Sequence, residues 1–308
     1  MKSAVRIPTY ALITAAHNEE AFIEKTIESV LRQTVLPIKW VVVDDGSTDK
    51  TSEIVKRYLS ANAWMTLIER PQRNDRSFAG KANAFNAAYD AIKCLEFDVI
   101  GNVDADISFV EDHFEFLLSK FPENPALGVV GATYYEDGYS SAADSFAGRN
   151  HVPGQCQLFR RQCWEEIDGY FPHRAGGVDW IAVTTARMKG WQTESFRERP
   201  FRHHRKMGTA RRRPVGAAFS HGERDYYLGG HPLWEIFRVA YRCTKRPYFV
   251  EGIALGCGYF FSLLRRAPRP VSKELMAYHR KAQMARLGAI AKSLAKFKRL
   301  DGFKLEGV

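Results

Sequence analysis

Four short apolar segments alternate with helical patterns through the first hundred residues of this chain. The apolar segments cover 10–16, 40–43, 65–68 and 97–103, and the intervals between them place apolar residues at helical spacing, as in Ile23, Ile27 and Val30. Strands that alternate with helices predict an α/β fold with a doubly wound, mostly parallel sheet and helices on both faces. Ligands of such sheets bind outside the carboxyl ends of the strands. We therefore expect a binding site where these segments end.

Three polar clusters follow the apolar segments directly, at 17–19, 44–49 and 104–106. In the third cluster, Asp104 and Asp106 are one residue apart and would project the same way from an extended chain. Two such carboxylates repel each other unless a cation lies between them or one of them binds a proton. Mg²⁺ or Mn²⁺ prefers oxygen ligands, and a diphosphate would bind such an ion in turn.

The net charge of +10 is concentrated in the C-terminal segment. Residues 265–308 hold twelve Lys and Arg against three Asp and Glu, which is +9 and leaves +1 for the rest. The five cysteines show neither the density nor the paired spacing of a disulfide framework or a zinc site. Residues 1–10 contain no apolar core of a secretory signal. We expect a reducing, cytoplasmic compartment.

The pattern becomes less regular after residue 109. Strands are predicted at 127–135, 155–160 and 192–196, helices at 178–189 and 234–241, and a loop rich in Arg and His at 197–213. These patterns predict a catalytic domain over 1–225 and a helical region over 226–308.

The helical region holds two unusual segments. Residues 249–264 are apolar, but they include Glu251 and three glycines and are shorter than the roughly 20 residues of a spanning helix. They fit an interfacial or re-entrant segment, or else a buried helix. In 273–299, Met276, Met284 and Ile290 fall on one side of a helix and Arg280 and Lys292 on the other. Such a basic amphipathic helix predicts a membrane-surface appendage, and the alternative is a helix that packs on the protein.

Two common phosphate-binding motifs are absent from the sequence. Neither a Gly-x-Gly-x-x-Gly loop after the first strand nor a Gly-x-x-x-x-Gly-Lys-Ser/Thr loop is present. Phosphate charge would therefore be met by a metal ion and by basic side chains.

Three ordered motifs carry a resemblance to a known family. Asp44-Asp45-Gly46-Ser47, Asp104-Ala105-Asp106 and Gly176-Gly177-Val178-Asp179-Trp180 resemble the signatures of family 2 glycosyltransferases with the GT-A fold. The likeness extends from about residue 10 to about residue 208, which is roughly two thirds of the chain.

The resemblance implies a nucleotide-sugar site at the strand ends. Asp45 corresponds to the family residue that binds the nucleotide base, and Asp104 to one that faces the ribose and the metal. Asp44 would support the loop around Asp45, or alternatively cap the helix that follows. The other positions implied are Ala15, His17, Glu19 and Lys81, of which Lys81 is alternatively a solvated helix residue.

The metal ligands are implied in the same way. Asp104 and Asp106 would bind a divalent ion, Mg²⁺ or Mn²⁺, and the third ligand would be His203 or His204, of which we favour His203. Solvated loop histidines are the alternative.

The resemblance also implies a catalytic base and contacts to the leaving group. Asp179 matches the family's base, although the usual Glu-Asp pair is Val178-Asp179 here. Its alternative role is a first-turn Asp favoured by the helix dipole. Arg205 and Arg212 would contact the departing diphosphate, unless they belong to a solvated basic loop.

These roles imply inverting, metal-dependent sugar transfer from a nucleoside-diphosphate sugar to a hydroxyl acceptor. Metal and Arg would neutralise the diphosphate, while Asp179 would accept the acceptor's proton. The expected acceptor is a lipid-linked glycan or polysaccharide precursor, as in bacterial cell-surface polysaccharide assembly. We expect a peripheral protein on the cytoplasmic face of the cell membrane, bound to anionic lipid and not to nucleic acid.

Two alternatives stay open. A sugar nucleotidyltransferase would usually carry a Gly-rich, Lys- or Arg-containing loop after the first strand, where this chain has Ala15-Ala16-His17-Asn18. A non-enzymatic basic protein that binds membranes or nucleic acid would not need Asp45, Asp104, Asp106 and Asp179 together.

Overall fold

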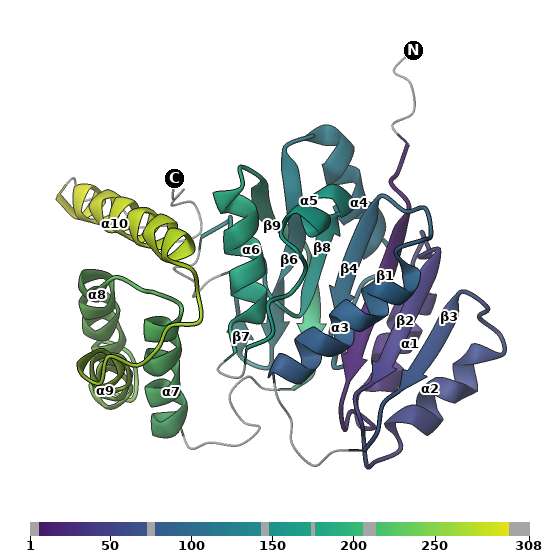
Figure 1. Cartoon of the computed structure of the whole chain (residues 1–308), viewed down its shortest axis with the longest axis horizontal. Helices are drawn as coiled ribbons and strands as arrows, with labels where there is room; N and C mark the ends of the chain where they lie inside the picture. The colour runs from purple at the N-terminus through teal and green to yellow at the C-terminus, as the bar shows by residue number, and fades with distance from the viewer. Residues whose placement is uncertain (1–5, 73–77, 143–147, 174–175, 206–213, 296–308) are drawn as a thin grey trace. The chain divides into compact units, whose positions relative to one another are not determined.

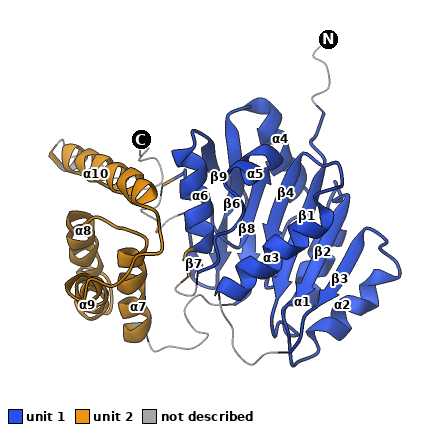
Figure 2. Cartoon of the chain, viewed as in Figure 1, with its two compact units in different colours: residues 1–145, 149–174, 178–205 blue, residues 146–148, 175–177, 206–308 orange. Residues whose placement is uncertain are grey.

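The computed structural model describes residues 6–72, 78–142, 148–173, 176–205 and 214–295 (Figure 1). The chain forms two compact units (Figure 2). Unit 1 holds residues 1–145, 149–174 and 178–205, and unit 2 holds 146–148, 175–177 and 206–308.

Unit 1 is built on one mixed sheet in the order β3-β2-β1-β4-β8-β6-β9-β5, with β7 paired to β6. The strands are β1 (Tyr10–Ala16), β2 (Lys39–Asp44), β3 (Met65–Glu69), β4 (Val99–Val103), β5 (Ile107–Ser108), β6 (Leu127–Glu136), β7 (Tyr139–Ser140), β8 (Cys156–Arg160) and β9 (Gln192–His203). β1, β2, β3 and β4 are mutually parallel, and β8 runs antiparallel to both β4 and β6. β6 therefore runs parallel to β4, and β9 is parallel to β6. The expected mostly parallel α/β sheet is confirmed, with β5, β7 and β8 reversed.

Helices cover both faces of this sheet (Figure 1). They are α1 (Ile23–Leu31), α2 (Thr51–Leu59), α3 (Phe78–Ile92), α4 (His113–Glu123), α5 (Arg161–Glu166) and α6 (Val178–Met188). Alternate residues of a strand belong to two separate hydrophobic cores, because successive side chains of a strand point to opposite faces of the sheet. Tyr10 and Leu12 pack with α1, α2 and α4, whereas Ala11 and Ile13 pack with α3, α5 and α6.

The expected strand 192–196 and loop 197–213 were wrong in their boundaries. β9 continues to His203, where it pairs with β6 through Phe201 and with β5 through His203. Its polar composition concealed the strand, since exposed Arg and Glu side chains alternate with the few that point inward. Residues 206–213 lie outside the described part of the chain.

Unit 2 is helical and consists, in its described part, of α7 (Pro214–Tyr227), α8 (Pro232–Cys243), α9 (Val250–Leu264) and α10 (Lys273–Ala295). The expected boundary at 225/226 differs from the observed one, since α7 belongs with the C-terminal helices. α7 and α9 approach so closely that a Cβ added to Gly222 would lie 1.9 Å from the Leu255 carbonyl oxygen. Within the described residues, none of the helices combines the length and the apolar character needed to cross a membrane.

The two-sided pattern expected for 273–299 is only partly observed. Leu275 and Ile290 of α10 are buried, but Arg280 is half-buried and its Nε donates to the Gly229 carbonyl, 3.0 Å away. Arg280 was predicted on the outer, basic side of the helix but packs within unit 2, whereas Lys292 is exposed as expected. The backbone N–H of His231 donates to Gln283 Oε1 at 2.7 Å. One side of α10 thus packs within unit 2, and residues 296–299 lie outside the described residues.

Candidate active site

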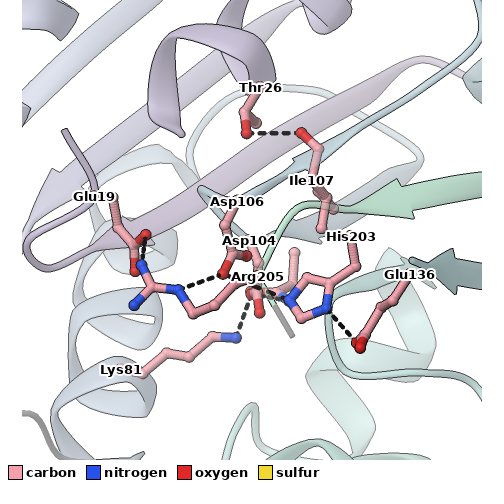
Figure 3. Close-up of polar contacts among 10 residues, drawn as sticks. Glu19, Thr26, Lys81, Asp104, Asp106, Ile107, Glu136, His203 and Arg205 are labelled. Atoms are coloured by element: carbon pink, nitrogen blue, oxygen red, sulfur yellow. Dashed lines mark hydrogen bonds and ion pairs between the residues drawn. The ribbon is translucent and has the colours of Figure 1, made fainter. Parts of the chain in front are cut away.

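Asp104 and Asp106 lie in the short turn between β4 and β5. The strand ends at Val103, so the two carboxylates are brought together by this turn and not by continued strand alternation. The Asp104 backbone N–H donates to the Gln155 carbonyl at 2.8 Å. Lys81 reaches over from α3 and forms an ion pair with Asp104 (Figure 3). Burial raises the pKa of Asp104, while the ammonium of Lys81 opposes that shift.

Asp106 lies at the centre of a second group of charges (Figure 3). His203 Nε2 is 3.5 Å from Asp106 Oδ2, and Arg205 Nε is 3.2 Å from the same oxygen. Arg205 also forms an ion pair with the buried Glu19. Burial opposes the ionisation of Asp106, but His203 and Arg205 outweigh it and lower its pKa. Side chains that follow β1, β4 and β9 thus meet at one edge of the sheet.

Glu136, which the sequence analysis did not select, holds His203 in place. His203 Nδ1 lies 2.7 Å from Glu136 Oε1, and it must donate because a carboxylate only accepts. Although burial opposes the charge of His203, Asp106 and Glu136 raise its pKa to about 9. Glu136 is the last residue of β6, whose carboxyl end lies at the same edge as that of β4. Polar residues at strand ends tend to form sites, and this rule would have identified Glu136 if the strand predicted at 127–135 had been extended by one residue.

The donor atoms at this edge suit a divalent ion. Within the part of the chain that the structure describes, no three His, Cys, Asp or Glu residues are already grouped as a metal site. Two of the predicted ligands, Asp106 and His203, face each other at 3.5 Å, and Asp104 is turned to Lys81. A carboxylate-held imidazole next to carboxylates is an arrangement that binds Mn²⁺ or Mg²⁺. The residues fit such an ion provided that Asp104 releases Lys81 and binds the ion instead.

The loop after β2 is tied to the loop after β1. Asp44 Oδ1 accepts a hydrogen bond from the Ser47 backbone N–H at 2.8 Å, so Asp44 stabilises its own turn and does not cap α2. His17 Nδ1 lies 3.0 Å from the Asp45 carbonyl. Asp45 is buried and forms an ion pair with Arg70 at 3.2 Å. Ala15, the penultimate residue of β1, pairs with Val43 of β2 beside this loop.

Arg70 is a second residue that the sequence analysis missed. It directly follows β3, and its backbone N–H donates to the Asp44 carbonyl at 2.9 Å. A cation at the end of the third strand of a parallel sheet was visible in the sequence, but the prediction placed its cations elsewhere, at Lys81, Arg205 and Arg212.

Asp179 lies in the first turn of α6, half-buried, against the backbone of Gly154. A Cβ added to Gly154 would be 2.3 Å from Asp179 Oδ2. The Gly154 carbonyl in turn accepts a hydrogen bond from Asn102 Nδ2 at 2.7 Å. The loop that contains Gly154 thus connects Asp179 to the end of β4, next to Asp104.

Of the remaining predicted residues, three join the charged side chains at the β4–β5 turn, one points away from them, and one lies outside the described residues. Glu19, Lys81 and Arg205 join the carboxylates of the β4–β5 turn, as described above. His204 points elsewhere, with Nε2 2.9 Å from Ser108 Oγ. Arg212 lies outside the described residues.

Comparison with known proteins settles the family. The model of "Glycosyl transferase family 2" matches residues 11–170, just over half of the 308 residues. The chain belongs to glycosyltransferase family 2. That match contains the β4–β5 turn and both loops that line the strand ends, so the resemblance drawn from the motifs is confirmed.

Individual family 2 proteins share parts of this chain. It is 30% identical over 154 residues to the uncharacterized glycosyltransferase EpsJ of Bacillus subtilis, which covers 50% of this chain and 40% of EpsJ. It is also 30% identical over 123 residues to poly-β-1,6-N-acetyl-D-glucosamine synthase of Staphylococcus aureus, covering 38% and 26%. The chain therefore spans less than half the length of these relatives.

Solved structures of similar fold include the mannosyltransferase PcManGT of Pyrobaculum calidifontis, described in complex with GDP-Man and Mn²⁺. The TM-score is 0.56 at 18% identity, over 96% of this chain and 82% of that one. This likeness supports the GT-A-like fold.

Proposed function

We propose that this chain transfers a sugar from a nucleoside-diphosphate sugar to a hydroxyl acceptor, with inversion at the anomeric carbon. The observation that carries the proposal is the convergence of Asp104, Asp106, His203 and Arg205 at the carboxyl ends of the strands. Family membership and the Mn²⁺ and GDP-Man of PcManGT support this function over sugar nucleotidyl transfer or a purely binding role.

Each group of residues has a role in the proposed reaction. Asp45 and His17 bind the nucleotide base, and Arg70 holds the Asp45 carboxylate against it. Asp104, Asp106 and His203 would hold a divalent ion, which neutralises the diphosphate when bound. Arg205 adds a fixed cation, and Arg212 is proposed as a further contact to the leaving diphosphate.

Asp179 acts as the general base in this proposal. Its carboxylate accepts the proton of the acceptor hydroxyl as the oxygen attacks the anomeric carbon and the bond to the diphosphate breaks. A single displacement from the face opposite the leaving group inverts that carbon. Gly154 leaves room for the carboxylate at this place, because a Cβ at position 154 would lie 2.3 Å from Asp179 Oδ2.

The proposed acceptor is a lipid-linked glycan or polysaccharide precursor at the cytoplasmic face of a membrane. The similarity to a Staphylococcus polysaccharide synthase and the basic C-terminal segment support that proposal.

Calorimetric titration with UDP, GDP and dTDP, with and without Mn²⁺, tests the donor site. One of these nucleotides should bind tightly only with Mn²⁺, and Asp106→Asn should remove that dependence together with the tight binding. Binding of equal strength without the ion, in wild type and in the variant, would overturn the metal assignment. No binding of any of the three would overturn the proposed donor class.

A further inference from the structure

Helix α9 of unit 2 has a row of apolar side chains on its exposed side. Its exposed residues are Val250, Ile253, Cys257, Phe261 and Leu264, which we call the α9 stripe. At 100° per residue these five positions fall within about 80° of one another. Ile253 is 57% exposed and Leu264 is 82% exposed. A water-facing helix side is normally polar, so the α9 stripe is the reverse of that pattern.

The buried side of α9 combines glycines and other small residues with two large ones, Leu255 and Tyr259. A Cβ added to Gly258 would lie 2.0 Å from the Phe219 carbonyl oxygen of α7, and one added to Gly252 would lie 2.4 Å from Cys243 Sγ of α8. Glycines therefore let three helices touch through their backbones. Close backbone packing through glycines, with apolar residues exposed on the other side, is typical of helices that face lipid.

The apolar surface extends beyond α9 itself. Eight of the sixteen exposed large hydrophobic side chains among the described residues fall between 233 and 264, including Tyr248 and Phe249 in the turn before α9. Phe249 has a φ of 65°, a strained conformation for a bulky residue, and its side chain is 64% exposed.

Basic side chains lie at both ends of the stripe. Lys245 and Arg246 precede it and Arg265 and Arg266 follow it, and all four are exposed. Glu251, the acidic residue within α9, forms an ion pair with Arg242. The stripe is thus apolar along its length and positive at its ends.

We propose that the α9 stripe is a membrane-binding surface that lies flat in the headgroup region of an anionic bilayer. The helix is about 22 Å long, which is shorter than a bilayer core and suits an orientation in the interfacial plane. Aliphatic and aromatic side chains enter the acyl boundary, and Arg and Lys at both ends bind lipid phosphates. This inference locates the membrane contact and does not depend on the transfer reaction.

Two other assignments fit the observations less well. Helix α10 carries more basic residues, but Leu275 and Ile290 are buried in unit 2 and Arg280 is bonded to Gly229. A second copy of the chain would place the positive ends of two stripes next to each other in an antiparallel two-fold contact, which like charges oppose. An anionic bilayer offers an apolar boundary for the side chains of the α9 stripe and negative phosphates for the basic residues at its ends.

Co-sedimentation with vesicles of phosphatidylcholine, alone or mixed equally with phosphatidylglycerol, tests the surface. The full chain should bind the mixed vesicles more tightly. The double variant Ile253→Asp with Phe261→Asp should lower that binding at least about ten-fold, because two apolar side chains no longer enter the bilayer. Both positions are exposed, so the variant should keep the melting temperature of wild type.

Two control variants show whether the loss of vesicle binding is specific to the α9 stripe. Val110→Asp makes the same kind of change at a residue of unit 1 that is 49% exposed, and it should leave vesicle binding within about two-fold of wild type. Lys281→Ala with Lys292→Ala removes exposed charge from α10 and should also have little effect. A larger loss in the α10 variant than in the stripe variant would overturn the proposal.

Two further measurements separate the remaining outcomes. Sedimentation velocity without vesicles would reveal a dimer that the stripe variant dissolves, and that result with unchanged vesicle binding would make the stripe a contact between copies. Mn²⁺-dependent nucleotide binding, measured on the stripe variant, should equal that of wild type. If wild type binds no nucleotide and the stripe variant still loses vesicle binding, the proposed function fails and the membrane surface stands.

Discussion

At the residue scale, Gly154 leaves room for the carboxylate of Asp179. A methyl group at this position would lie 2.3 Å from Asp179 Oδ2, so Gly154→Ala must displace the carboxylate. A displacement of about 1 Å can slow an enzyme roughly a hundred-fold, and we expect a fall in kcat of at least about ten-fold with unchanged nucleotide affinity. Steady-state kinetics and calorimetry on one preparation measure both. Gly288→Ala, where an added Cβ has no neighbour within 4 Å, is the matched control.

Glu136 is expected to support metal binding through His203. Carboxylates that orient a metal-binding imidazole are typically worth ten- to a hundred-fold in metal affinity. Glu136→Leu should weaken Mn²⁺ binding by about that factor, and Glu136→Gln should restore part of it, because an amide oxygen still accepts from Nδ1. Direct Mn²⁺ titration is the readout. The exposed neighbour Asp137, replaced in Asp137→Asn, should have no effect, and equal losses in both variants would argue against the orienting role.

Several side chains of the site could be predicted from the sequence, and others could not. Asp104 and Asp106 lie in one turn and His203 faces Asp106, because strand ends of a parallel sheet share one edge, and their role as metal ligands stays a prediction. Glu136 and Arg70 were missed although both also lie at strand ends. Their roles depend on which partner the fold places opposite each charge, and only the three-dimensional pairing of β6 with β9 and of β2 with β3 decides that.

At the scale of the elements, the limit of sequence reasoning is clearest in β9. The segment after Phe196 looks like a basic loop, yet it continues as a strand because β6 and β5 pair with it on both sides. Tertiary pairing here outweighs local composition. By contrast, β1, β2 and β4 are mostly apolar and were predicted to within about two residues, since strands covered on both faces need no polar alternation.

Helix α4 carries a buried histidine that should make unit 1 sensitive to acid. His113 is fully buried next to Phe109, and burial lowers its pKa to about 3. The unfolded chain binds a proton near pH 6.5 and the folded one does not, so stability falls as the pH drops from 6.5 towards 3. The loss from this group should reach about 2 kcal/mol at pH 5.

The variant His113→Phe removes the group that titrates. Urea unfolding at pH 7 and pH 5 should show a smaller loss of stability in the variant than in wild type. Equal losses would mean that His113 is not the cause of the acid sensitivity.

At the scale of the whole molecule, the chain combines a GT-A-like unit with a helical unit that exposes several large apolar side chains. The sequence showed that 249–264 is apolar and contains three glycines. It did not show which of these residues would face outward. α7 and α9 meet through Gly222 and Gly258, and Leu255 and Tyr259 are buried, whereas Ile253, Phe261 and Leu264 lie on the exposed side. The apolar run in the sequence thus located the helix but not its exposed face.

The proposed transfer reaction depends on Asp179 as its base. Turnover of Asp179→Asn, measured on enzyme whose nucleotide affinity and melting temperature equal those of wild type, tests it most directly. Asparagine keeps the size and much of the capping ability of aspartate but cannot accept the proton. We predict a fall in kcat of roughly a hundred- to ten-thousand-fold with donor binding intact. A kcat within a few-fold of wild type would contradict the account and exclude Asp179 as the base.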